Sequence, residues 1–113
     1  MGEERRRFPR VRQPFKVQYR VGEVGGAWEA ATAINISAVG VRLRSDQPIE
    51  QGSRLELQIQ LPASREPLDV LGIVVWNRMQ APNVTEVGVE FLNLTLVQQT
   101  KIDHLVQFLS NRV

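Results

Sequence analysis

PFKVQYRV, residues 14–21, alternates apolar and polar side chains without interruption. The apolar members share one face of an extended chain: Phe15, Val17, Tyr19 and Val21. Lysine, glutamine and arginine occupy the opposite face. A period of two is typical of a β-strand with one face in a hydrophobic core and the other in water. The stretch therefore predicts a half-buried strand.

The same alternation recurs in five further segments, separated by short loops rich in turn-forming residues. These segments cover residues 27–37, 39–45, 54–61, 68–80 and 85–92. Six short strands joined by turns predict a small antiparallel barrel.

The alternation also assigns faces within these segments. In residues 27–37, it places Trp28, Ile34 and Ile36 in the core. In residues 39–45, Val39 begins the inward-facing set, and the arginines between its members point outward. In residues 68–80, Gly72 is a candidate for a β-bulge, because glycine inside a strand often marks one.

The apolar period changes near the C-terminus. Four residues there recur at helical spacing: Ile102, Leu105, Val106 and Leu109. Thr95 and Gln98, three residues apart, have the spacing of a capping box. We therefore predict an all-β protein, with a six-stranded antiparallel β-barrel over residues 13–92 and a C-terminal α-helix over residues 95–112.

Length and composition are those of a single globular domain over residues 1–113. No segment approaches the roughly 18 consecutive apolar residues of a membrane span. No apolar signal-peptide region follows the basic start, and the sequence contains no cysteine. These features predict a soluble, cytoplasmic protein.

Charge is distributed unevenly along the chain. Residues 1–20 hold seven basic side chains and two acidic ones, a net charge of +5, although the whole chain carries only +2. Five arginines lie within ERRRFPRVR, residues 4–12. The planar guanidinium suits phosphates and base edges, so this asymmetry indicates an anionic partner. With few apolar groups and many like charges, residues 1–12 are predicted to form a flexible arm.

Residues typical of catalysis are scarce. His104 is the only histidine in the sequence, and it follows Asp103 on the predicted helix, where a surface position is expected. No glycine-rich phosphate loop and no histidine pair with metal-ligand spacing occurs. The sequence therefore predicts a binding protein without cofactor or metal, not an enzyme.

NISAVG, residues 35–40, places two polar side chains on one face of a strand. Asn35 and Ser37 are two residues apart, so both point away from the predicted core. Gly40 follows at a place where a side chain would obstruct anything resting on that wall. Taken alone, the pattern also fits an ordinary strand end and turn.

Together with the arginine-rich arm, NISAVG resembles the PilZ domain family. That family has two motifs, R-x-x-x-R and [D/N]-x-S-x-x-G, and both occur here in the expected order. The matching positions are Arg5 (in the extended form R-R-x-x-x-R), Arg6, Arg10, Asn35, Ser37 and Gly40. The resemblance covers nearly the whole chain, including VVW at residues 74–76, VGVEF at residues 87–91 and the closing helix.

The resemblance implies a bacterial receptor for cyclic di-GMP. Arg6 and Arg10 would then bind guanine O6/N7 edges and phosphates, which match the arginine fork. Arg5 would stack on a base or hold a second ligand molecule. Asn35 would accept from guanine N1–H and N2–H, less well than a carboxylate does, and Ser37 would bond a nearby oxygen.

Trp76 is a further candidate, as a stacking platform for guanine. It faces outward if Ile73 and Val75 face inward, although it could also be an ordinary packed strand tryptophan. Arg42 and Arg44 project from the same wall and are expected to be solvated, with phosphate contacts as the alternative.

The resulting interpretation is a receptor that relays cyclic di-GMP levels to an unidentified protein partner, without membrane insertion. Ligand would pin Arg6 and Arg10 against the Asn35–Ser37 wall and order the arm. Two alternatives remain open. One is a PilZ-like adaptor that has lost ligand binding, and the other is a small RNA- or DNA-binding barrel, although no nucleic-acid polymer is expected as a partner.

Overall fold

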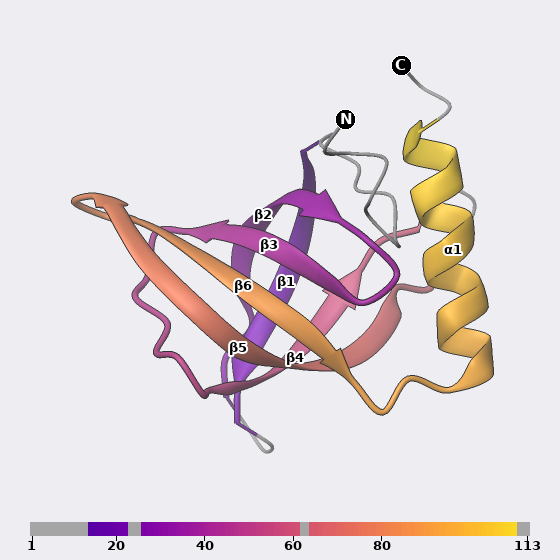
Figure 1. Cartoon of the computed structure of the whole chain (residues 1–113), viewed down its shortest axis with the longest axis horizontal. Coiled ribbons are helices and arrows are strands. Elements are labelled where there is room, and N and C mark those ends of the chain that lie inside the picture. Colours follow the sequence, from indigo (N-terminus) through magenta and orange to yellow (C-terminus); the bar gives the residue numbers. More distant parts are fainter. Residues whose placement is uncertain (1–13, 23–25, 62–63, 111–113) are drawn as a thin grey trace, which may run out of the picture.

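The protein forms a closed barrel of six antiparallel strands followed by one helix (Figure 1). The computed structural model describes residues 14–22, 26–61 and 64–110. The elements are β1 (Phe15–Val21), β2 (Glu29–Ile36), β3 (Gly40–Ser45), β4 (Arg54–Ile59), β5 (Leu68–Ala81), β6 (Val84–Leu92) and α1 (Leu96–Ser110). Around the barrel the strands run in the order β1-β2-β3-β6-β5-β4. The predicted fold is confirmed, and the arginine-rich arm lies outside the described residues.

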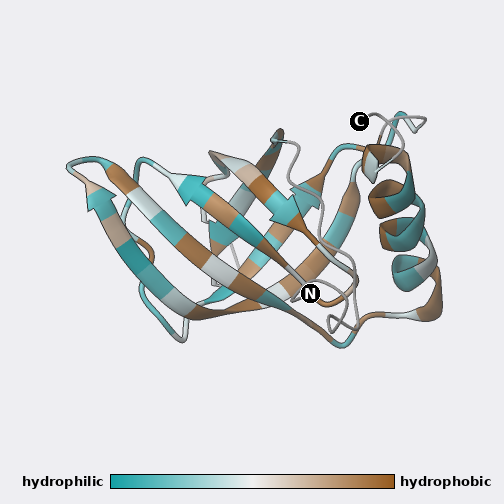
Figure 2. Cartoon of the chain, turned by 45° about the horizontal axis from the view of Figure 1, so that its top comes forward, coloured by the Kyte–Doolittle hydropathy of each residue, from teal (hydrophilic) through white to brown (hydrophobic). Residues whose placement is uncertain are grey.

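The barrel interior is filled by the apolar side chains that the alternation selects. Stripes of hydrophobic and hydrophilic residues alternate along the strands in Figure 2. The core includes Val17, Tyr19, Leu43, Leu55, Leu57, Ile59, Val87, Val89 and Phe91. The Tyr19 hydroxyl forms a hydrogen bond with Ser45 Oγ at 3.1 Å, and burial raises the pKa of this phenol. The two buried hydroxyl groups thereby satisfy each other inside a largely apolar core.

Helix α1 lies beside one end of the barrel (Figure 1). Its first turn carries the predicted capping box: Thr95 N donates to Gln98 Oε1 at 2.8 Å, and Gln98 N donates to Thr95 Oγ1 at 3.1 Å. The buried face consists of the four predicted residues, Ile102, Leu105, Val106 and Leu109. His104 is exposed, as expected. In the parts of the chain that the structure describes, no helix is long and apolar enough to cross a membrane.

The face assignment in β2 is wrong for its first half. A register shift between Ala33 and Asn35 breaks the pairing with β3, so Ala31 and Ala33 point into the core in place of their neighbours. Ile36 is buried as predicted, but Ile34 is only half-buried. Trp28 is therefore not a core residue. The bulge changes the phase of the strand immediately before the NISAVG motif.

The bulge in β5 lies two residues beyond the predicted one. Pairing with β6 continues in register through Gly72 and shifts between Val74 and Trp76. Val74 is buried, whereas Val75 is 42% exposed. The condition given for an outward Trp76, that Ile73 and Val75 face inward, is therefore not met, yet Trp76 is on the outer wall because the bulge turns it there.

Candidate functional site

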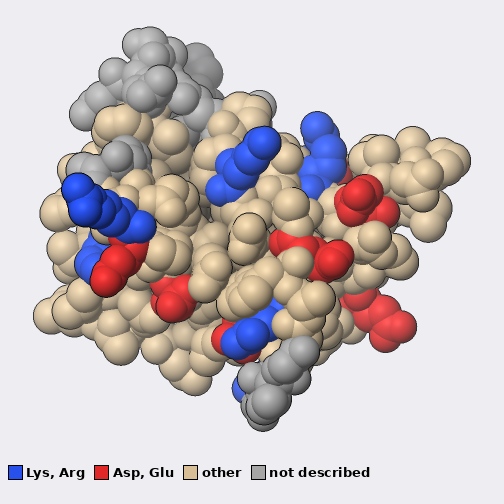
Figure 3. All heavy atoms as spheres, turned by 180° about the vertical axis from the view of Figure 1, so that it is seen from behind, with Lys and Arg blue, Asp and Glu red and all other residues tan. Residues whose placement is uncertain are grey.

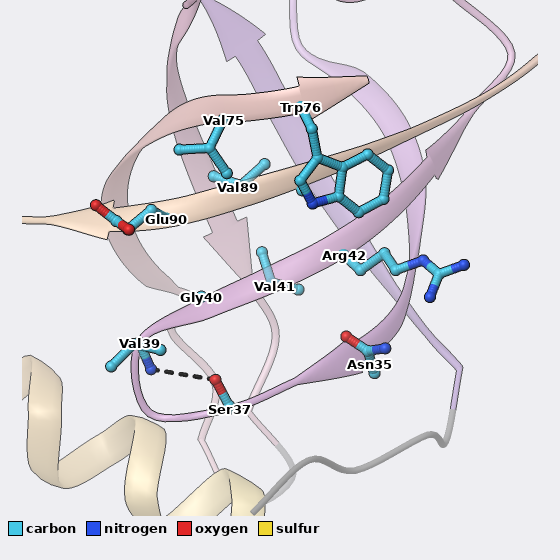
Figure 4. Close-up of a pocket in the computed structure, with 11 residues that line it drawn as sticks. Asn35, Ser37, Val39, Gly40, Val41, Arg42, Val75, Trp76, Val89 and Glu90 are labelled. Carbon is cyan, nitrogen blue, oxygen red and sulfur yellow. Dashed lines mark hydrogen bonds between the residues drawn. The ribbon is translucent and has the colours of Figure 1, made fainter. Parts of the chain in front are cut away.

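A pocket of about 250 Å³ lies on the outer wall of the barrel, over β2, β3, β5 and β6 (Figure 4). Four of the predicted site residues line it: Asn35, Ser37, Gly40 and Trp76. The other three, Arg5, Arg6 and Arg10, lie outside the described residues. The structure thus brings together the second motif and the candidate tryptophan, which are about 40 positions apart in the sequence.

Strand register explains why these residues meet. Asn35 is paired with Arg42 across β2 and β3, Arg42 with Gly88 across β3 and β6, and Gly88 with Trp76 across β6 and β5. The four residues form one row across four strands, and the side chains of Asn35, Arg42 and Trp76 share the outer face. The pocket therefore has a rigid sheet as its floor.

Gly88 provides the space in which the Trp76 indole lies. A Cβ atom built on Gly88 would overlap Nε1 and Cε2 of the indole. Figure 4 shows the indole extending across β6 toward Arg42. The ring therefore rests directly on the β6 backbone, and 36% of the residue remains exposed.

Gly40 is required by close strand packing. A Cβ atom at this position would overlap the carbonyl oxygen of Val89, a backbone atom of β6. The sequence predicted a glycine here to leave room for a ligand resting on the wall. That reason is incomplete, because the contact with β6 already requires a glycine without any ligand. Phe91 N donates to Val39 O at 2.9 Å and fastens the preceding turn to the same strand.

The turn between β2 and β3 holds Ser37 in place. Ser37 is buried, its backbone N donates to Gly40 O at 2.9 Å, and its Oγ accepts from Val39 N at 3.3 Å. The hydroxyl therefore keeps its own proton available for donation. The predicted inward orientation of Val39 is wrong, because this residue is 47% exposed on the pocket rim.

Next to the pocket, one buried carboxylate binds two arginines. Glu86 Oε1 accepts from Arg42 Nη2 at 2.7 Å and from Arg42 Nε at 3.2 Å, and Oε2 accepts from Arg44 Nη2 at 2.9 Å. The Glu86 side chain is only 5% exposed. The Arg42 hydrogen bond is the main cause of the lowered pKa of the Glu86 carboxyl. Arg42 and Arg44 are thus paired, where full solvation was expected.

Cations also lie close to the tryptophan. Arg42 Cζ is 5.7 Å and Arg78 Cζ is 5.9 Å from the centroid of the Trp76 ring, within the range of cation–π attraction. The pocket lining therefore combines an aromatic ring, the guanidinium group of Arg42, the amide of Asn35 and the carboxylate of Glu90, and the Arg78 guanidinium lies close to the same ring.

Sequence reasoning missed Gly88 and Glu86. Both lie in TEVGVEF, and the alternation that buries Val87 and Val89 already places them on the outer wall. The glycine within that strand was a usable signal, since strand glycines mark sites of close approach. The pairing of Glu86 with Arg42 depends on contacts 44 residues apart, which no local pattern reveals.

The PilZ domain family model matches residues 4–108, nearly the whole chain. The chain belongs to the PilZ domain family. No curated protein sequence shows significant similarity to this PilZ domain.

Solved structures share its fold at low sequence identity. The inhibitor of motility MotI/DgrA from Bacillus subtilis matches with a TM-score of 0.71 and 20% identity, covering 96% of this chain and 50% of that one. The K. pneumonia MrkH–c-di-GMP complex matches with a TM-score of 0.72 and 18% identity, covering 96% and 53%. The PilZ domain of YcgR from Escherichia coli, with c-di-GMP, matches with a TM-score of 0.68 and 13% identity, covering 96% and 93%. The chain spans about half the length of the MotI/DgrA and MrkH chains.

The chemistry of the PilZ pocket suits a planar, anionic ligand. An exposed indole face accepts a stacked ring, arginine donates to anionic oxygens, and the Asn35 amide can both donate and accept. Among the described residues, no group of three or more His, Cys, Asp or Glu is placed to hold a metal ion.

Proposed function

We propose that this PilZ domain is a cyclic di-GMP receptor, which binds the dinucleotide between its N-terminal arm and the pocket on the outer wall. The observation that carries the proposal is the meeting of Asn35, Ser37, Gly40 and Trp76 around one pocket. The MrkH complex and the YcgR PilZ domain each contain c-di-GMP, which supports the same ligand class here.

The size and chemistry of the pocket agree with this ligand. A space of about 250 Å³ accommodates one guanine but not a whole dinucleotide. The remainder of the ligand must therefore extend over the rim, where the arm would cover it. Guanine would stack on Trp76, its N1–H and N2–H groups would meet Asn35, and Ser37 would donate to a nearby oxygen.

The start of β1 favours a role for the arm. Phe15, the first residue of β1, pairs with Ala33 of β2, two residues before Asn35, so β1 begins close to the pocket. Arg10 precedes Phe15 by five residues, a reach of about 17 Å when extended, and Arg6 by nine, about 30 Å. Both guanidinium groups can therefore reach a ligand in the pocket and bind its phosphates and guanine edges.

Isothermal titration of cyclic di-GMP tests the proposal. Saturable heat is expected for the wild type and none for an Arg6→Ala/Arg10→Ala variant, while an Asn35→Ala variant should bind about tenfold more weakly. GMP and a short RNA serve as controls. Absence of heat from folded wild-type protein would favour the adaptor alternative, and salt-sensitive heat with RNA would favour a polynucleotide partner.

On the face shown in Figure 3, basic and acidic side chains are interspersed, which does not suit a polyanion.

Hydrogen exchange tests how binding is transmitted. If ligand pins Arg6 and Arg10 against the wall, amide exchange in residues 1–12 should slow when cyclic di-GMP is added. The ordered arm would then present a new surface to a protein partner. Equal exchange rates with and without saturating ligand would exclude this readout.

A further inference from the structure

Glu86 is an unusual residue for the outer wall of a barrel. Its side chain is 5% exposed although it points away from the core, and both of its oxygens accept hydrogen bonds from arginines. A buried carboxylate is costly unless it is fully paired. The arginines satisfy this carboxylate, and in return the carboxylate fixes the arginines.

Arg42 is the arginine that this contact places at the pocket. Glu86 binds its Nε and Nη2 atoms, which leaves Nη1 without a hydrogen-bond partner in the described part of the chain. Arg42 lines the pocket, is paired in register with Asn35 and lies 5.7 Å from the Trp76 ring. A long, flexible side chain is thereby held with one donor edge open beside the aromatic platform.

We propose that Glu86 is a positioning residue of the ligand site: it holds Arg42 beside Trp76, so that the open edge of Arg42 binds a phosphate of the dinucleotide. This inference rests on the proposed function of the pocket and extends the site beyond the two sequence motifs. Arg44 binds the other oxygen of Glu86, is 52% exposed on its side chain and does not line the pocket, so it completes the pairing without touching ligand.

A purely electrostatic role for Glu86 predicts the opposite effect of mutation. Cyclic di-GMP carries two negative phosphates, so removing a nearby carboxylate should strengthen binding if only net charge matters. If Glu86 acts by fixing Arg42, its removal should weaken binding, because the freed side chain must be ordered when ligand arrives. The sign of the change in Kd therefore separates the two roles.

The molecule contains a matched control for this test. Arg20 on β1, Trp28 just before β2 and Glu56 on β4 form a second arginine–tryptophan–glutamate group. None of these three lines the pocket. Glu56→Ala removes the same charge and the same kind of hydrogen bond as Glu86→Ala, at a distance from the proposed ligand.

The experiment measures the Kd of cyclic di-GMP by titration calorimetry for five proteins: wild type, Glu86→Ala, Arg42→Ala, the double variant and Glu56→Ala. We expect Glu86→Ala and Arg42→Ala each to weaken binding about tenfold, the typical effect of losing one charge-assisted contact. The double variant should bind no more weakly than Arg42→Ala alone, since Glu86 acts through Arg42. Glu56→Ala should stay within about twofold of the wild type.

Thermal unfolding of each variant shows whether it is folded at the titration temperature. Arg42 is a partly exposed surface residue, so Arg42→Ala keeps the inference testable even if Glu86→Ala does not fold. An Arg42→Ala protein that binds as the wild type does would overturn the inference.

The remaining outcomes distinguish the inference from the proposed function. If the wild type binds and Glu86→Ala binds equally well or more tightly, the positioning role fails while the receptor function stands. The same holds if the effects of the two single variants add in the double variant. If the folded wild type does not bind cyclic di-GMP at all, the receptor function fails and the positioning role falls with it.

Discussion

Two arginine–tryptophan–glutamate groups on the outer wall use the same side chains in different ways. In the Glu56 triad (Arg20, Trp28, Glu56), Arg20 donates from Nε to Oε2 at 3.0 Å and from Nη2 to Oε1 at 3.1 Å. Its Cζ lies 4.5 Å from the Trp28 ring. Both carboxylate oxygens and one face of the guanidinium are therefore satisfied within the group.

The Glu86 triad (Arg42, Trp76, Glu86) leaves an arginine donor and an aromatic face without a partner inside the group. Its carboxylate is shared between Arg42 and a second arginine, and the Trp76 ring is farther from Arg42 than Trp28 is from Arg20. The group borders a pocket, with an exposed ring and an open arginine edge. The same three residue types thus satisfy one another in the Glu56 triad, whereas the Glu86 triad leaves donors and an aromatic face available.

Backbone glycines account for the difference. Gly88 lets the Trp76 indole lie flat on β6, and Gly40 lets β3 approach β6 closely, which brings Arg42 into the same row. Close backbone approach, more than the choice of polar side chains, therefore produces the open arrangement.

Gly40→Ala should have the largest effect on stability. It disturbs the strand packing beneath the Glu86 triad and leaves the Glu56 triad unchanged. The added methyl group would overlap the Val89 carbonyl oxygen, and backbone atoms cannot move aside without separating β3 from β6. We expect a loss of about 3 kcal/mol in the free energy of unfolding, measured in urea.

Gly26→Ala is the matched change near the Glu56 triad. The nearest atom to its added Cβ is the Val21 carbonyl oxygen at 3.2 Å, a contact that a small shift can relieve. Its loss of stability should be much smaller. Equal losses for the two variants would show that strand contact at Gly40 is not the special feature of this wall.

Glu86→Ala and Glu56→Ala compare the triads directly. Glu86 is buried and bound by two arginines, so its removal should cost about 2 kcal/mol of unfolding free energy at neutral pH. Glu56 is 26% exposed, and water screens and replaces its ion pair with Arg20, so its loss should be clearly smaller. Urea unfolding at moderate salt measures both. A larger loss for Glu56→Ala would reverse the ranking of the triads.

Much of the barrel was predictable because its core follows a local period of two. Val17 and Tyr19 in β1 and Leu55 and Leu57 in β4 are buried as the alternation predicts, and the capping box correctly begins the helix. These features depend on neighbours in sequence. A single chain segment contains the information needed to predict them.

The errors occur where register between distant strands decides the outcome. The bulges after Ala33 and after Val74 depend on hydrogen bonding to β3 and β6, so the sequence of β2 or β5 alone does not reveal them. Both bulges flank the pocket, beside Asn35 and Trp76. The motif residues of the wall were thus predictable by resemblance, whereas the row that joins them, and the pairing of Glu86 with Arg42, required the assembled barrel.

The pH dependence of stability gives the finest comparison. Hydrogen bonds from Arg42 and Arg44 hold the pKa of Glu86 below its ordinary value of 4.5, so the folded state binds this proton less readily than the unfolded state. The stability contributed by the Glu86 carboxylate is then complete above the unfolded pKa and is lost as pH falls through the lower, folded pKa.

The difference in unfolding free energy between wild type and Glu86→Ala should therefore be constant near neutral pH and shrink on acidification below about pH 4.5. Urea unfolding of both proteins between pH 7 and pH 3 measures it, and each pH needs the same ionic strength because salt screens the pair. A difference that stays constant to pH 3 would mean that packing of the side chain, and not its charge, stabilises the protein at this position. Pairing with a charged Glu86 would then not explain why Arg42 and Arg44 lie beside the pocket.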